Sequence, residues 1–317
     1  MAYYTKINKY NLQKHVDQYK IGKLFYFKGI KEGIENTNYF FKTEKGNFVL
    51  TIFENKITER IKNKNLTFFI DLIKFLRIKN FPTPSILRDI NKKHLINFYN
   101  KPSVIVEFIT GNNPKNINKN HCYELGKILS VLHKNSLKFK KKKKNNFSLN
   151  EWEILIYKKL NLKKNHFLFL KNEIEFLKKN WPKNIPSGII HGDLFPDNVF
   201  FKKNKINGII DLSNACNDFF CYDLSICINA WCFNKKIDLN KTRNLIKGYS
   251  FVRKLQKKEI NYFPIFLRAS SLRFYLSRLM DSKNKRIPKQ YKKNPNEYLK
   301  KLKYFQENNL SNFFNKI

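Results

Sequence analysis

Short apolar stretches bounded by turn residues dominate the first part of the chain. They are rich in aromatic and β-branched residues, a composition typical of strands, and the sequence Glu44-Lys45-Gly46 between two of them favours a hairpin turn. The last of these stretches ends at Ile109, before the polar sequence TGNNPKNINKN. This pattern predicts strands over residues 23–30, 94–100 and 102–109, and a hairpin over residues 36–54.

Helical periodicity becomes the main pattern after these strands. Residues 65–78 already carry apolar side chains on one helical face and stop before Pro82, which cannot continue a helix. Residues 121–134 repeat the pattern. Ser148 and Glu151 fit a capping box, in which each side chain binds a backbone N–H of the other residue, and so predict the start of the next helix.

The two patterns together predict an α+β fold of two lobes. The first lobe, residues 1–109, is expected to be mainly β with one helix, and the second, residues 110–317, to be mainly helical. A basic run, KFKKKKK at 138–144, interrupts the second lobe. Because like charges repel, we expect this run to be a solvated loop.

The composition is that of a globular protein with a large positive charge. Hydrophobic residues make up 42% of the 317 positions, and 63 Lys and Arg against 24 Asp and Glu give a formal net charge of +39. Such a charge can attract nucleic acid. The lysines are dispersed along the whole chain, however, so nucleic-acid binding is the less favoured interpretation of the charge.

The cysteines and the amino terminus point to a reducing compartment. The five cysteines form no C-x-x-C pair, and Cys216, Cys221, Cys227 and Cys232 share one apolar stretch in which they predict small core residues. The first residues lack the apolar core of a signal peptide, and no apolar stretch reaches the roughly 18 residues of a membrane span. We therefore expect a cytoplasmic protein that does not enter a membrane; its oligomeric state is not indicated.

An acidic island, IIHGDLFPDNVFF at 189–201, stands out against this basic background. Asp193 and Asn198 stand in the pattern H-x-D-x-x-x-x-N, which resembles the catalytic loop of protein kinases. Asp193 can orient an acceptor hydroxyl and take its proton, while Asn198 offers an oxygen to Mg²⁺. A hairpin pattern then leads to Asp211 at the end of the apolar stretch INGIID, where a carboxylate is expected to bind metal.

Other polar residues of the motif have supporting interpretations. We expect His191 to brace the loop and Asp223 to accept hydrogen bonds from the loop backbone. Asp197 either caps the turn before Asn198 or adds to the site. A lone H-G-D would be weak evidence, but its conjunction with DN, the hairpin and IIDLSNA is specific.

The motifs HGDLFPDN and GIIDLSNA resemble those of the aminoglycoside phosphotransferase/choline kinase family. Three further stretches, FKGIKEGIENTNYFFKTEKGNFVLTIFE, YDLSICINAWCF and LRFYLSRLMD, resemble the kinase-like type of homoserine kinases. The resemblance covers nearly the whole chain. It implies a protein-kinase-like fold and transfer of phosphate from ATP, with Mg²⁺, to L-homoserine in threonine biosynthesis. It also implies that Asp193 is the catalytic base and that Asn198 and Asp211 are the metal ligands.

The residues expected to bind the nucleotide match the family pattern less completely. The resemblance places the nucleotide-covering loop at Lys28, Gly29 and Gly33, although their spacing is G-x-x-x-G and not G-x-G-x-x-G. It places the adenine-binding hinge at the backbone of Glu107 and Ile109. The lysine that such kinases carry on the third strand is missing here, since Thr51 stands near its place; Lys28 or Lys42 is the candidate replacement.

The acceptor site is the least defined part of the sequence. A carboxylate is bound naturally by arginine, which makes Arg268 and Arg273 candidates, with a structural ion pair as the alternative for each. Arg278 has the same two interpretations. Asn36 and Asn38, in a loop predicted at IENTN, are candidates for substrate or nucleotide contact, with loop capping as the alternative. Asp218 and Asp281 are candidates for binding the ammonium group.

Two other functions remain open from the sequence. One is a kinase of the same fold that acts on choline, an aminoglycoside or another small hydroxyl compound, although a polycationic aminoglycoside fits poorly with so basic a second lobe. The other is a basic nucleic-acid-binding protein on an inactive kinase scaffold. The intact set of Asp193, Asn198 and Asp211 argues against inactivity.

Overall fold

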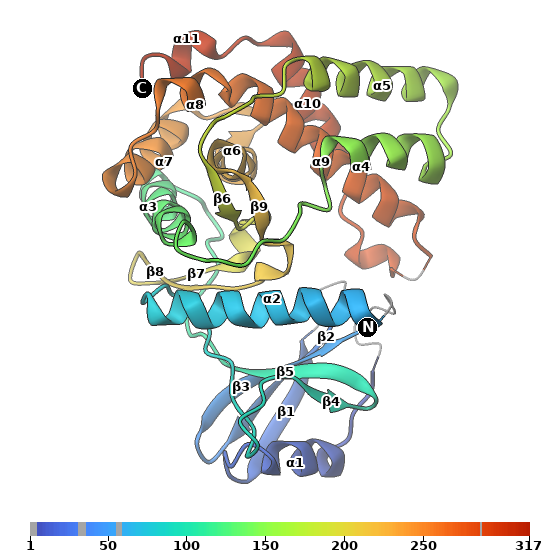
Figure 1. The fold of residues 1–317 in the computed structure, drawn as a ribbon, viewed down its shortest axis with the longest axis vertical. Helices are drawn as coiled ribbons and strands as arrows, with labels where there is room; N and C mark the ends of the chain where they lie inside the picture. The colour runs from blue at the N-terminus through green and yellow to red at the C-terminus, as the bar shows by residue number, and fades with distance from the viewer. Residues whose placement is uncertain (1–4, 31–35, 55–58, 286) are drawn as a thin grey trace. The chain divides into compact units, whose positions relative to one another are not determined.

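The computed structural model describes residues 5–30, 36–54, 59–285 and 287–317. The chain divides into two compact units (Figure 1). Unit 1 comprises residues 1–111, 207–210 and 286–291, and unit 2 comprises residues 112–206, 211–285 and 292–317. Residues 207–210 and 286–291 thus belong to unit 1 although they come late in the chain, so no single boundary separates the two units. The boundary at 109/110 remains our proposal for the main division of the chain.

Unit 1 contains an antiparallel sheet with the strand order β1-β2-β3-β5-β4. Its hairpin turn lies where the sequence predicted it, with Thr43 paired with Gly46. Two details of the prediction were wrong: Asn36 and Asn38 lie in β2 and not in a loop, and the last strand ends at Glu107. The strands are β1 (Leu24–Ile30), β2 (Asn36–Thr43), β3 (Gly46–Phe53), β4 (Ile96–Phe98) and β5 (Lys101–Glu107).

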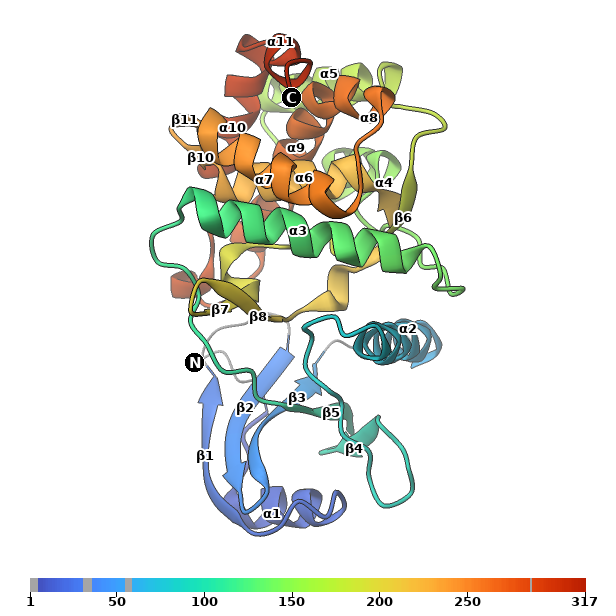
Figure 2. The same ribbon diagram turned by 90° about the vertical axis from the view of Figure 1, so that its left-hand side faces the viewer.

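The core of unit 1 lies between this sheet and a helix that the sequence analysis missed, α1 (Lys9–Asp17). Leu12 and Val16 of α1 pack with alternate residues of the strands, such as Phe41 and Leu50, which share one face of the sheet. Figures 1 and 2 show α1 against the sheet. The predicted helix is present as α2 (Glu59–Ile78) and begins earlier than the expected residue 65.

Unit 2 is mainly helical, as predicted. Its helices are α3 (Lys119–Ser136), α4 (Leu149–Ile154), α5 (Lys164–Lys179), α6 (Phe220–Trp231), α7 (Leu239–Val252), α8 (Lys257–Asn261), α9 (Phe263–Lys283), α10 (Asn296–Glu307) and α11 (Ser311–Phe314). In the part of the chain that the structure describes, no helix is both long and apolar enough to cross a membrane.

Helix α6 is the central helix of unit 2 and is surrounded by the others (Figures 1 and 2). Nearly all its residues are buried, which is typical of a helix that is apolar around its whole circumference. Helices α3 and α7 approach closely because both carry glycine at the contact. A side chain at Gly126 would meet the Leu245 carbonyl oxygen at 2.0 Å, and one at Gly248 would meet the Tyr123 carbonyl oxygen at 2.0 Å.

Two sequence predictions for unit 2 need correction. Ser148 precedes α4, but its side chain makes no capping hydrogen bond, so the predicted capping box is wrong. The helix also changes to a π-helix over Leu155–Lys159. The basic run is not simply solvated, because its end is anchored by hydrogen bonds: the Lys143 backbone N–H donates to Asn217 Oδ1 at 2.8 Å. The cysteines are buried and free, as expected of core residues.

Short strands and 3₁₀ turns connect the helices of unit 2 and carry the polar motif. Strand β6 (Ser187–Ile190) pairs antiparallel with β9 (Cys216–Phe219), and β7 (Val199–Lys202) forms the predicted hairpin with β8 (Lys205–Ile209). The remaining elements of unit 2 are the 3₁₀ turns at Pro196–Asn198 and Leu212–Asn214 and the strands β10 (Phe233–Asn234) and β11 (Lys236–Ile237), while the 3₁₀ turn at Lys289–Tyr291 belongs to unit 1.

Candidate active site

The H-G-D motif forms a tight loop directly after β6, and Asp223 of α6 holds its backbone. One Asp223 oxygen accepts from the His191 N–H at 2.8 Å and the other from the Gly192 N–H at 2.9 Å. Gly192 has a φ of +75°, in the left-handed region that favours glycine. Arginine, the usual residue of the kinase pattern at this place, would be strained in that conformation.

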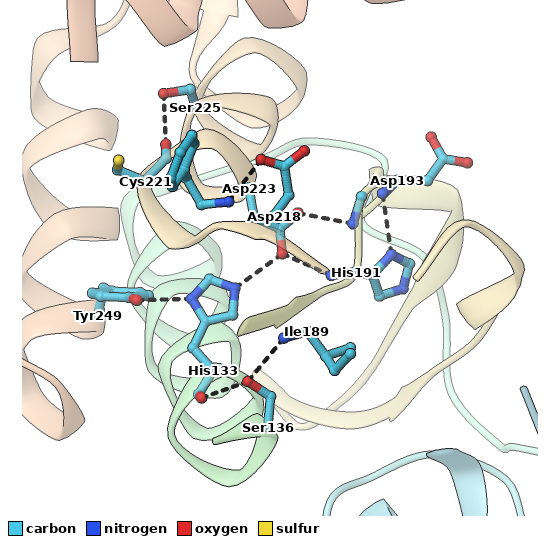
Figure 3. A network of polar contacts seen from close by, with 12 residues as sticks. His133, Ser136, Ile189, His191, Asp193, Asp218, Cys221, Asp223, Ser225 and Tyr249 are labelled. Carbon is cyan, nitrogen blue, oxygen red and sulfur yellow. Dashed lines mark hydrogen bonds and ion pairs between the residues drawn. The ribbon is translucent and has the colours of Figure 1, made fainter. Parts of the chain in front are cut away.

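The buried side chains of His133 in α3 and Tyr249 in α7 extend this anchor (Figure 3). Arg253 Nη1 donates to the Tyr249 hydroxyl at 3.1 Å, the Tyr249 hydroxyl lies 2.7 Å from His133 Nδ1, and His133 Nε2 lies 3.0 Å from Asp223. Because Asp223 can only accept when ionised, His133 must carry its proton on Nε2, and Nδ1 then accepts from Tyr249. Every hydrogen bond of the chain therefore points toward Asp223.

The expected supporting roles of Asp223 and His191 agree with this geometry. Burial alone would raise the pKa of the Asp223 carboxyl, but hydrogen bonds from His133 and Gly192 reverse the effect and hold that pKa below its usual value. Burial lowers the pKa of His133, so its imidazole is neutral at pH 7. His191 Nδ1 accepts from the Asp193 backbone N–H at 3.2 Å, which braces the loop from inside.

Asp193 has a different environment from that of Asp223. Its carboxylate points away from the network of Figure 3, and Asn214 Nδ2 contacts it at 3.4 Å. Burial raises the pKa of Asp193 to about 6; the charge of Arg273 opposes this rise and that of Asp211 adds to it. A carboxylate with this pKa is ionised at neutral pH and basic enough to take a proton.

Asn198 and Asp211, the predicted metal ligands, flank Asp193. Asn198 Nδ2 donates to the Asp193 carbonyl oxygen at 2.8 Å, which directs its amide oxygen the other way. Asp211 is exposed and has a φ of +61°, which short polar side chains tolerate better than others do. Ser213 donates to Asp211 through its hydroxyl, at 2.5 Å, and so supports this conformation.

These two residues fit a magnesium ion of limited protein coordination. Among the described residues, no three His, Cys, Asp or Glu side chains gather as a metal-binding group. Mg²⁺ keeps several waters and is commonly held by one or two protein oxygens together with substrate phosphates. The Asp211 carboxylate and the Asn198 amide oxygen make up such a donor set.

Arg273, a candidate for substrate binding, lies at the back of the loop. Its Nη1 donates to the Gly192 carbonyl oxygen, and its guanidinium packs against the rings of Phe147 and Phe274, with its carbon 4.8 and 4.6 Å from their centroids. Among the described groups, its buried Nε has no hydrogen-bond partner. These contacts tie α9 to the loop that carries Asp193.

The other two arginines of α9 form ion pairs, the alternative interpretation of each. Arg268 makes two hydrogen bonds to Glu173, at 2.9 and 2.5 Å, and Arg278 Nη1 lies 2.6 Å from Glu297. The Glu173 side chain is 1% exposed, so the Arg268 pair is buried. Both arginines are occupied by protein carboxylates.

Some residues near Asp193 were missed by the sequence analysis. Asn214 contacts its carboxylate, Lys143 Nζ donates to the Ser213 carbonyl oxygen at 2.6 Å, and Asn145 Nδ2 donates to Asp218 at 2.6 Å. Lys143 and Asn145 are far from the motif in sequence, and no sequence pattern distinguished Lys143 from the other lysines of the run at 138–144. Asn214 lies three residues after Asp211, and only the resemblance could have indicated it.

The candidate nucleotide residues belong to unit 1. Lys28 and Gly29 lie in β1, with Lys28 Nζ 5.8 Å from the centroid of the Phe40 ring, while Gly33 lies outside the described residues. Glu107 ends β5, and Ile109 packs against Gly208, where a side chain would meet it at 2.3 Å.

At the place of the missing third-strand lysine, Thr51 donates to Asn38 Oδ1 at 2.7 Å. The Asn38 side chain thus forms a cross-strand contact within the sheet.

Comparison with known proteins gives consistent results. A model of the phosphotransferase enzyme family matches residues 27–253. A homoserine kinase of Bartonella tribocorum is 37% identical over 98% of both chains, and one of Agrobacterium fabrum is 37% identical over 96% of this chain and 95% of its own. The structure of an amicoumacin kinase superposes with a TM-score of 0.71 at 15% identity, covering 97% of this chain and 94% of its own. The predicted kinase-like α+β fold is thereby confirmed.

Proposed function

Since the chain belongs to the phosphotransferase enzyme family, we propose that it is a homoserine kinase, which transfers the γ-phosphoryl group of ATP to the hydroxyl of L-homoserine. The observation that carries this proposal is 37% identity to homoserine kinases over nearly the whole of both chains. Kinases of choline or aminoglycosides, and an inactive nucleic-acid-binding scaffold, are not favoured by it. We assign the product, O-phospho-L-homoserine, to threonine biosynthesis in the cytoplasm.

The chemical step needs one base and a neutralised phosphate chain. We assign the base to Asp193, which accepts the proton of the homoserine hydroxyl while that oxygen bonds to the γ-phosphorus and the bond from phosphorus to the β–γ bridging oxygen breaks, releasing ADP. Its pKa of about 6 supports this role at neutral pH. Asn214 orients the carboxylate by its contact with Oδ2.

The metal and the nucleotide are assigned to separate groups of residues. Asn198 and Asp211 would hold Mg²⁺, which supplies charge neutralisation to the phosphates of ATP. Lys28, Gly29 and the backbone of Glu107 and Ile109 are proposed to bind ATP, as the family resemblance implies.

Measuring ATP consumption by the purified protein with Mg²⁺ would test the proposal. L-Homoserine, L-serine, choline and an aminoglycoside are offered separately, and turnover is expected with L-homoserine well above the others. Preference for another acceptor would keep the phosphotransferase chemistry and overturn the substrate. In the same assay, Lys28→Ala should raise the KM for ATP more than Lys42→Ala does; equal, negligible effects would remove both lysines from the nucleotide site.

A further inference from the structure

The segment Lys143–Phe147 meets β9 at its first two residues and then turns. The Asn217 N–H donates to the Lys143 carbonyl oxygen at 2.8 Å, and Lys144 forms a parallel bridge with Asn217. After this bridge the chain turns, and the Phe147 N–H donates to Asn145 Oδ1 at 2.7 Å.

Three side chains of this segment, those of Lys143, Asn145 and Phe147, contact different residues around the candidate site. Lys143 binds the carbonyl oxygen of Ser213, whose hydroxyl binds Asp211. Asn145 binds the carboxylate of Asp218, and the ring of Phe147 packs on Arg273. One short segment therefore contacts the Asp211 loop and the carboxylate of Asp218 directly, and the Asp193 loop through Arg273, which binds the Gly192 carbonyl oxygen.

The segment brings a positive and a negative group to the same region. Lys143 is partly buried, and Asp218 is partly buried with one oxygen held by Asn145 and the other by the Phe219 N–H at 2.7 Å. The Arg273 guanidinium packs on the Phe147 ring and binds the carbonyl oxygen of Gly192, the residue before Asp193. A carboxylate has acceptor sites beyond two hydrogen bonds, so Asp218 can take another donor.

This arrangement matches the chemistry of the proposed acceptor. Homoserine is short and carries a carboxylate and an ammonium group, so both must be bound close to the base that receives its hydroxyl proton. We propose that Lys143–Phe147 forms one wall of the acceptor site, with Lys143 binding the carboxylate of the amino acid and Asp218 its ammonium group. This assignment rests on the proposed function and adds the residues that select an amino-acid acceptor.

Two other cations near Asp193 are less suited to the acceptor carboxylate. Arg273 is 4% exposed, and its Nη1 already binds the Gly192 carbonyl oxygen. Lys293 pairs with Asp197 at 3.1 Å, and both side chains are more than half exposed, so solvent screens the charge. Lys143 is the cation that is held in place by the site itself.

A test must separate recognition of the acceptor from support of the Asp211 loop, because Lys143 also contacts Ser213. Two analogues of homoserine allow this: 3-amino-1-propanol lacks only the carboxylate, and 4-hydroxybutanoate lacks only the amine. We would measure kcat/KM for each acceptor at saturating ATP, or the competitive inhibition constant where an analogue is not phosphorylated. The proteins are the unmodified chain, Lys143→Met, Asp218→Asn and the control Lys142→Met, a neighbouring exposed lysine.

The expected result is a crossed pattern. Lys143→Met should lower kcat/KM for L-homoserine by about tenfold to a hundredfold, the usual effect of losing a charged hydrogen bond. It should leave 3-amino-1-propanol within about twofold, since that acceptor has no carboxylate to lose. Asp218→Asn should spare 4-hydroxybutanoate in the same way, and Lys142→Met should change none of the three.

Equal losses for L-homoserine and 3-amino-1-propanol in Lys143→Met would overturn the inference, because they would mean that Lys143 only supports the Asp211 loop. An effect of Lys142→Met equal to that of Lys143→Met would overturn it in favour of general electrostatics. No turnover of L-homoserine by the unmodified protein would instead overturn the proposed function, and the inference with it. The melting temperature and the KM for ATP of each variant guard against misfolding.

Discussion

Asp223 and Asp193 lie in the same small region, yet burial affects their carboxyl groups in opposite ways. Asp223 is fully buried, but it receives hydrogen bonds from His133 and from the backbone N–H groups of His191 and Gly192, and its pKa is lowered. The Asp193 carboxylate is contacted by Asn214 Nδ2 at the longer distance of 3.4 Å, and its pKa is raised to about 6. The donors around a carboxylate, more than its burial, decide which form is stable.

This difference separates the anchor of the loop from its reactive end. The anchor is held by three successive hydrogen bonds, from Arg253 to Tyr249, from Tyr249 to His133 and from His133 to Asp223. At the reactive end, the Asp193 carboxylate receives fewer hydrogen bonds than Asp223 does, so its ionised form is less stable and more basic. Catalytic groups commonly show such perturbed pKa values.

Replacing the carboxylate of Asp193 is expected to have the largest effect, a loss of activity. Asp193→Asn removes the proposed base without changing the shape of the side chain, so kcat should fall by about a thousandfold, measured with ATP, Mg²⁺ and L-homoserine. Asp197→Asn, which changes an exposed carboxylate of the same loop, is the control and should retain most activity. Comparable losses in both variants would remove Asp193 from its special role.

The next effect is on stability and concerns the anchor. Asp223→Ala leaves His133 and two backbone N–H groups without their acceptor, so the free energy of unfolding should fall by about 3–4 kcal/mol. Asp193→Ala removes a carboxylate whose ionisation destabilises the folded state at this pH, so the free energy of unfolding should not fall. Urea denaturation of both variants at pH 7 measures the difference; equal losses would show that the two carboxylates are equally embedded.

The smallest expected effect is the pH dependence that Asp193 gives to the free energy of unfolding. The pKa of Asp193 is raised in the folded protein from 3.8 to about 6, so the folded state is favoured by this group below pH 4 and loses that contribution as the pH rises through 6. Without added metal, Asp193→Asn should therefore raise the free energy of unfolding by about 3 kcal/mol at pH 8. The gain should disappear near pH 4, and a gain independent of pH would contradict it.

Much of the fold could be predicted from the sequence because its signals are local. The strands of unit 1 follow from aromatic and β-branched runs, and the hairpin at Glu44–Gly46 from its turn residues. Helix α1 was missed because KYNLQKHVD has few apolar residues, and it forms only where Leu12 and Val16 can cover the sheet. Ser148 was misassigned because a capping pattern does not guarantee the hydrogen bonds.

The sequence by itself determined the kinase-like fold and the candidate roles of Asp193, Asn198 and Asp211, because these residues lie in compact motifs whose spacing reflects their chemistry. Only the tertiary structure decided the partners of more distant residues. It paired Arg268 with Glu173, placed Arg273 at Gly192, and brought Lys143 and Asn145 beside β9. These contacts join residues that are far apart in the chain, so their pairing depends on the folded arrangement of the helices and strands.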